Sequence, residues 1–329
     1  MPRRRDQREP SEPRPTSRRH QVNWSLHDPG TSGQQREIWD QDEEFEDEFE
    51  EEEESDDEEQ PSPKRRSSHK RRRDAGVPRM RPRDIKAFRW IGEQGAARRD
   101  DLRELLGRMP EGQTNEPGRL SASRMRHIIE ERWEPAGMVY YKTLLGKQWV
   151  WLSKRGLHAA DLPWSPHRPA DINLEHIHQI NRVRLYLEDL YRSKKLKGEW
   201  ESERWYERHK KEWLALGKAD SGVYVPYEYR MHHAPDGLWR FRNEGQTEDN
   251  LAVIEVEISA KNEDQLDRIM HALAVYAPVV WYYVDMDAEE GVYDGLMKIL
   301  AGIDERRRGR FFFYDLDDPA RLVYHYERT

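Results

Sequence analysis

The sequence contains no cysteine. This absence excludes a disulfide framework, a thiolate metal site and a redox-active thiol. Long hydrophobic runs are missing as well, since no stretch approaches the roughly 18 apolar residues that a membrane span requires. The arginine-rich beginning of the chain is not followed by an apolar segment, as it would be in a secretion signal. We therefore expect a cytoplasmic protein that makes no contact with a membrane.

Apolar residues are scarce overall. They make up 35% of the 329 residues, whereas charged residues make up 36%. This is too little apolar surface to offset the entropy lost on ordering the whole chain. The length suggests two domains of ordinary size if part of the chain stays unfolded.

Charge is distributed in blocks near the beginning of the chain. Residues 1–80 hold 16 Lys/Arg and 22 Asp/Glu, and the acidic run Asp42–Glu59 lies between two basic clusters. Blocks of like charge repel one another, so we predict a disordered charged tail over 1–80. Alternatively, Glu50–Glu54 mimics phosphates and occupies a basic site of the same chain, or the tail recruits a relaxase or replication protein. The rest of the chain carries a net charge of −2, so any affinity for DNA must come from local patches.

The first region with a folding pattern covers residues 83–160. Apolar residues at helical spacing predict a helix with Asp84 as its N-cap and Gly95 at its end. A second helix is predicted around 102–106, and a third follows Ser121 as its N-cap. The period then changes to two, which predicts a β-hairpin over 138–152.

Three helices followed by a hairpin are the plan of a winged-helix domain. In that plan the third helix enters the major groove of duplex DNA and the hairpin touches the backbone. Basic residues gather on these two elements: Arg119, Arg124, Arg126, Arg132, Lys142 and Lys147. We therefore predict that 83–160 binds double-stranded DNA. The alternatives are a small helical domain with solvated arginines, or a winged helix that contacts proteins.

A linker with three prolines, 161–169, leads to a second predicted domain over 171–329. Its pattern alternates between helix and strand. Helices are predicted at 172–192, 200–213, 264–275 and 291–300, and strands at 223–230, 238–242, 250–259, 279–284, 311–314 and 322–326. This order predicts an α+β or α/β fold in which helices flank a mixed sheet.

Three carboxylates and one lysine of this domain form a candidate site. Alternation places Glu255 and Glu257 on one face of a strand, and the turn before the preceding strand can bring Asp236 beside them. Such carboxylates repel unless a cation lies between them, and their hard oxygens suit Mg²⁺ or Mn²⁺, which activates water. Lys261 could neutralise developing charge. Alternatively, the two glutamates are the polar face of an edge strand and Asp236 belongs to an ordinary turn.

A family resemblance rests on four segments: His-Ala-Pro-Asp-Gly at 233–237, Ala-Val-Ile-Glu-Val-Glu-Ile-Ser-Ala-Lys at 252–261, Tyr276, and Val-Trp-Tyr-Tyr-Val at 280–284. Over residues 83–329 the chain resembles the replication-relaxation proteins of actinobacterial plasmids and integrative elements. The resemblance implies a winged helix joined to a domain similar to the PD-(D/E)XK nucleases. Asp236 then matches the Asp of that motif and Glu255 its (D/E) position, whereas Glu257 stands where the motif has lysine.

Two functions follow from this pattern. One is a metal-dependent DNA endonuclease of a mobile element, in which Asp236, Glu255 and Glu257 hold the metal and Lys261 stabilises charge. The other is a non-catalytic DNA-binding accessory or regulatory protein that keeps the nuclease fold as a scaffold, which the glutamate at 257 favours. In the endonuclease, Glu203 would add a further carboxylate to the metal site. Alternatively, Glu203 simply faces solvent. A zinc pair is not expected, because two histidines two residues apart, at 176 and 178, cannot share a helical face.

Overall fold

The computed structural model describes residues 80–109, 118–219, 224–259, 261–286 and 292–325. The chain divides into two units, Met1–His69 and Lys70–Thr329, and every described residue belongs to the second. The charged tail predicted over 1–80 lies outside the described residues, apart from residue 80. Within the described ranges, no helix is both long and apolar enough to cross a membrane.

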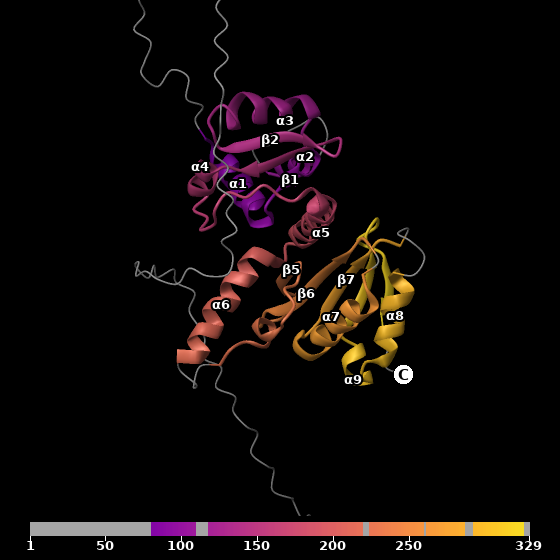
Figure 1. The fold of residues 1–329 in the computed structure, drawn as a ribbon. Coiled ribbons are helices and arrows are strands. Elements are labelled where there is room, and N and C mark those ends of the chain that lie inside the picture. Colours follow the sequence, from indigo (N-terminus) through magenta and orange to yellow (C-terminus); the bar gives the residue numbers. More distant parts are fainter. Residues whose placement is uncertain (1–79, 110–117, 220–223, 260, 287–291, 326–329) are drawn as a thin grey trace, which may run out of the picture. The chain divides into compact units, whose positions relative to one another are not determined.

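The first half of the described chain combines helices with a small antiparallel sheet (Figure 1). Its elements are α1 (Pro82–Gln94), β1 (Ala97–Arg98), α2 (Arg99–Gly107), α3 (Ala122–Ile128), a π-helical turn (Ile129–Trp133), β2 (Val139–Leu144), β3 (Lys147–Leu152) and α4 (Lys154–Ala159). The strands lie in the order β1-β3-β2. The fully buried rings of Phe88 and Trp133 meet edge-on in the core, with their centroids 5.0 Å apart.

Two of the predicted helix starts have different outcomes. Ser121 caps α3 as predicted, because its hydroxyl accepts the backbone N–H of Arg124 at 3.2 Å. Asp84 is not the N-cap of α1: the cap is Arg81, and the Asp84 carboxylate accepts the Arg81 N–H at 2.7 Å from the third helical position. Pro82 allows this earlier start, because proline suits the first helical position and acidic residues favour the first turn.

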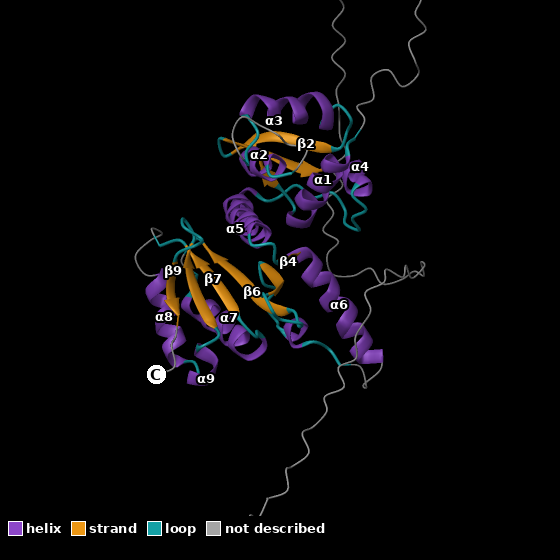
Figure 2. Ribbon diagram, turned by 180° about the vertical axis from the view of Figure 1, so that it is seen from behind, coloured by secondary structure: helices purple, strands orange, loops and turns teal. Residues whose placement is uncertain are grey.

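The second half contains a six-stranded mixed sheet (Figure 2). Its elements are a 3₁₀ turn (Asp171–Asn173), α5 (Leu174–Ser193), β4 (Lys197–Ser202), α6 (Glu203–Ala219), a 3₁₀ turn (Tyr227–Arg230), β5 (Gly237–Arg242), β6 (Asn250–Glu257), α7 (Glu263–Tyr276), β7 (Val280–Val284), α8 (Val292–Gly302), α9 (Glu305–Arg308), β8 (Phe311–Asp315) and β9 (Leu322–His325). The strands follow one another in chain order across the sheet. β4, β5 and β6 are antiparallel, β6, β7 and β8 are parallel, and β9 is antiparallel to β8. The prediction of a mixed sheet flanked by helices is confirmed.

The alternation along the strands separates two apolar layers. Leu238, Val253 and Tyr282 lie in the layer that α7 and α8 cover, whereas Trp239 and Ile254 lie in the layer that α5 covers. Because successive side chains of a strand point to opposite faces, the position of one residue fixes the face of its neighbours. Glu255 and Glu257 therefore share the face of Val253.

One predicted strand is wrong. Residues 227–230 form a 3₁₀ turn, 224–226 are not a strand, and Val223 lies outside the described residues. Pro226 precedes the turn and has no N–H for a sheet ladder. The first strand of the sheet is instead β4, so the helix expected from Trp200 begins at Glu203. Trp200 pairs with Trp239 across β4 and β5, a long-range contact that the local spacing of aromatic residues does not show.

Candidate functional site

Asp236 lies immediately before β5 and is tied to β6. Its Oδ2 accepts the backbone N–H of Val256 at 2.7 Å, and Nε2 of His176 on α5 lies 3.4 Å from the same oxygen. The next residue, Gly237, lies beneath the Trp200 indole, where an added Cβ would come within 2.3 Å of ring carbon Cζ2. Packing on β4 thus explains the glycine of the Pro-Asp-Gly motif.

Glu255 and Glu257 lie on β6, which has β5 on one side and β7 on the other. Each has only 2% of its surface exposed. The alternative that they form the polar face of an edge strand is therefore wrong. Two carboxylates this deeply buried require partners, because an unpaired charge inside a protein is strongly disfavoured.

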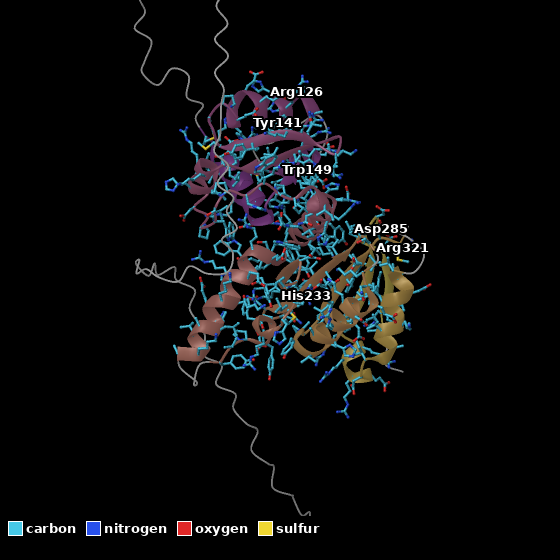
Figure 3. The ribbon with its side chains drawn as sticks, viewed as in Figure 1. Arg126, Tyr141, Trp149, His233, Asp285 and Arg321 are labelled. Atoms are coloured by element: carbon cyan, nitrogen blue, oxygen red, sulfur yellow. The ribbon has the colours of Figure 1, made fainter. Side chains whose placement is uncertain are left out.

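Both glutamates have basic partners from the chain itself. Nε2 of His233 lies 3.1 Å from each carboxylate oxygen of Glu255, and Figure 3 labels this histidine beside the sheet. Nζ of Lys261 donates to Oε2 of Glu257 at 2.6 Å. Burial opposes the charged form of His233, but the Glu255 carboxylate outweighs it and raises the histidine pKa. The pKa of Lys261 is raised in the same way, because the Glu257 charge outweighs burial.

Glu203 and His176 complete the surroundings of Asp236. Glu203, at the start of α6, keeps an exposed side chain. The protein around its carboxylate and the negative charge of Asp236 still raise its pKa to about 7. Burial opposes a charged His176, but Asp236 raises the pKa of that histidine to about 9. His178 instead places Nδ1 2.8 Å from Asp101, so the two histidines diverge, as the helical spacing predicts.

No family model, curated protein or solved structure matches this chain. The chemistry of the site is therefore judged on its own geometry. Across the described ranges, no group of three or more His, Asp or Glu side chains is arranged to hold a metal ion. His233 engages both carboxylate oxygens of Glu255, whereas Lys261 engages one oxygen of Glu257 and the backbone of β6 engages one oxygen of Asp236. These contacts occupy oxygens that a divalent cation would need.

The basic residues predicted to contact DNA have two different environments. Arg124 and Arg126 on α3, and Lys142 and Lys147 on the hairpin, are exposed; Figure 3 labels Arg126. Arg119 is also exposed.

Arg132 differs from these five residues. Its Nη2 donates to Oδ2 of the fully buried Asp84 at 2.6 Å, and only 17% of its side chain is exposed. We therefore remove Arg132 from the predicted DNA surface. Its charge compensates a buried carboxylate, which spacing along the chain does not reveal.

A second carboxylate cluster was not predicted. Glu201 on β4 has its Oε1 2.8 Å from Nδ1 of His209 and accepts the Tyr229 hydroxyl at 2.9 Å, while Arg240 donates to Oε2 at 3.3 Å. These four residues come from β4, α6, a 3₁₀ turn and β5, so no local motif contains them. Both carboxylate oxygens are hydrogen-bonded, which indicates a structural network.

The Glu201 network predicts acid sensitivity. Burial alone would raise the Glu201 pKa, but His209, Arg240 and Tyr229 outweigh it and hold the pKa below the ordinary 4.5. The network's stabilisation is therefore complete above about pH 4.5 and is lost as pH falls through the lowered pKa of the folded state. We expect Glu201→Gln to destabilise the protein at pH 7 and the difference from wild type to narrow below pH 4.5, measured by urea unfolding. A constant difference across this range would contradict the assignment.

Proposed function

We propose that this chain is a DNA-binding accessory protein of plasmid or mobile-element replication or transfer, in which the C-terminal sheet serves as a non-catalytic scaffold. The observation that carries the second half of this proposal is the pairing of both buried glutamates with His233 and Lys261. A metal site would offer these oxygens to a divalent cation. Here the protein supplies the positive charge itself.

The region from α1 to β3 supports the proposal that this chain binds DNA. The order α1, β1, α2, α3, β2, β3 fits a winged helix, with α3 as the recognition helix and β2–β3 as the wing. Four exposed basic residues lie on these two elements: Arg124, Arg126, Lys142 and Lys147. Such residues neutralise phosphates and release counterions on binding.

The scaffold half is supported by topology. A helix, three antiparallel strands, a helix and a parallel strand follow one another as α5, β4–β6, α7 and β7, with α6 inserted after β4. Asp236 immediately precedes β5 and Glu255 lies on the neighbouring β6, in keeping with the resemblance to PD-(D/E)XK nucleases. This arrangement supports the proposed nuclease-like fold.

The first test measures how DNA binding depends on salt. Full-length protein is titrated into a fluorescent 30-base-pair duplex at several salt concentrations. We expect the double variant Lys142→Ala/Lys147→Ala to reduce the slope of log K against log salt by about 2, since each phosphate contact contributes about 0.9.

The matched control is Lys154→Ala/Arg155→Ala, which removes the same charge from exposed positions of α4. We expect this control to leave the slope close to wild type. Equal losses in both double variants would show that binding depends on total charge alone. No binding by the wild type would overturn the proposed DNA-binding function.

A metal-dependent phosphodiesterase is the second candidate, and Glu203 favours it. Burial raises the pKa of Glu203, and the negative charges of Asp236 and Glu255 raise it further. A fourth acidic group therefore lies within electrostatic reach of the cluster. Extra carboxylates at one place are typical of sites for Mg²⁺ or Mn²⁺.

Calorimetry of the full chain with Mn²⁺, combined with plasmid nicking on the same samples, separates the two candidates. We expect no saturable Mn²⁺ binding and no nicking from the wild type or from Asp236→Ala. Binding and nicking that are both present in the wild type and both lost in the variant would replace the scaffold with a metal nuclease.

A further inference from the structure

The turn of the β2–β3 hairpin contains an unusual residue. Leu144 pairs with Lys147, so Leu145 and Gly146 alone form the turn. Both have positive φ, +49° for Leu145 and +71° for Gly146. Two-residue turns of this kind favour Asn-Gly, because asparagine tolerates the left-handed region. A leucine there is disfavoured, because its Cβ crowds the following carbonyl oxygen.

Burial does not offset this cost. The Leu145 side chain leaves 69% of its surface exposed, so it packs little against its own chain. Single exposed leucines are ordinary on protein surfaces. A leucine that is both exposed and held in an unfavourable backbone region is less ordinary, because neither packing nor backbone preference selects it. Contact with another molecule would explain why a leucine occupies this position.

The hairpin below the turn is fully paired. β2 and β3 pair at every position from Val139 and Leu152 to Leu144 and Lys147, and Trp149 and Val150 are buried. The rings of Tyr140 and Trp151 also pack across the two strands, with their centroids 5.7 Å apart. The turn is therefore carried by a well-supported pair of strands.

The charge beside the turn identifies the partner. Lys142 on β2 and Lys147 on β3 are both exposed. Duplex DNA carries phosphates on both sides of a stack of largely apolar bases. Two ammonium groups beside an apolar tip therefore suit its surface. An apolar pocket on a protein would accept the leucine but gives no role to the lysines.

We propose that Leu145 is an apolar wedge that inserts between base pairs from the minor groove of duplex DNA, while Lys142 and Lys147 hold the flanking phosphates. This inference rests on the proposed DNA-binding function and adds a mode of recognition. Insertion unstacks one base step and bends the duplex, so binding favours sequences whose steps unstack easily, such as TA.

Leu145→Asn separates stability from binding, because the two change in opposite directions. We expect a higher midpoint of thermal unfolding, since asparagine relieves the backbone cost. We also expect about tenfold weaker binding to a TA-containing duplex, in keeping with loss of one buried apolar side chain. The duplex carries 2-aminopurine beside the TA step, and its fluorescence should rise with full-length wild type but not with the variant.

Two further variants complete the test. Leu145→Met keeps an apolar tip and should retain the fluorescence rise, whereas Lys147→Ala should bind more weakly but show the full rise at saturation. If Leu145→Asn binds and unstacks DNA as the wild type does, the wedge is overturned and DNA binding stands. If the wild type binds duplex without any fluorescence change, the wedge is likewise overturned. If the wild type binds no duplex, the wedge and the proposed function both fail.

Discussion

Replacing Asp84 with alanine should lower the free energy of unfolding by about 3–5 kcal/mol, the range for breaking a buried ion pair by removing one partner. The Asp84 side chain is completely buried, and its Oδ2 accepts both the Arg81 backbone N–H at 2.7 Å and Nη2 of Arg132 at 2.6 Å. Removing the carboxylate takes away a partner of the Arg132 charge and an interaction that caps α1. Urea unfolding of the full chain measures the loss.

A double-mutant cycle tests the pairing. Arg132→Met, which keeps an apolar stem, should destabilise the protein alone but add little in the Asp84→Ala background. The control is Arg126→Ala, since Arg126 is 60% exposed and its partner Glu130 lies 3.8 Å away. Exposed pairs contribute about 0–1 kcal/mol. Additive effects of the Asp84 and Arg132 substitutions would contradict a shared ion pair.

Replacing Lys261 with alanine should destabilise the protein by about 2–3 kcal/mol. This lies below the 3–5 kcal/mol of a fully buried pair, because 26% of the lysine side chain still reaches solvent. The loss arises because the buried Glu257 carboxylate, with 3% of its side chain exposed, is left without the nearby ammonium group. Urea unfolding again supplies the measurement.

Glu257→Gln in the Lys261→Ala background should recover much of this stability, because a neutral amide needs no counter-ion. The same variants distinguish a structural lysine from a catalytic one. If Lys261→Ala retains wild-type stability but abolishes a metal-dependent cleavage seen in wild type, Lys261 would instead act in a nuclease. The proposed scaffold predicts a change in stability alone.

Elements with a clear period were predicted well. The hairpin expected over 138–152 contains β2 and β3, and the strands expected at 238–242 and 250–259 contain nearly all of β5 and all of β6. The helix expected at 264–275 lies within α7. In each, the alternation or helical spacing of apolar residues records which face is buried, so a local pattern suffices.

Elements that depend on distant partners were not predicted. β1 has two residues and exists because it pairs with β3. β4 was read as part of a helix, since only pairing with β5 reveals it as a strand. Within the strand expected at 223–230, Tyr227–Arg230 form a 3₁₀ turn instead, and Tyr224 and Tyr227 are exposed. Aromatic content alone does not separate a buried strand from a surface turn.

The candidate site shows the same division. The spacing of Glu255 and Glu257 determined that they share a face, and the motif spacing brought Asp236 to the neighbouring strand. The partner of Asp236 on α5, His176, precedes it by 60 residues and was considered only as a zinc ligand. His233 belongs to the motif that contains Asp236, but its pairing with both oxygens of Glu255 is a matter of side-chain geometry.

The sequence by itself determined the period of most elements, the faces of the strands and the basic character of α3 and the hairpin, because these follow from residue type and spacing. Only the tertiary structure decided which charges face solvent and which face one another. Arg126 and Arg132 lie six residues apart, yet one is exposed and the other compensates buried Asp84. The reason is physical: a buried carboxylate must find its cation within a few ångströms in space, and distance along the chain places no limit on where that cation comes from.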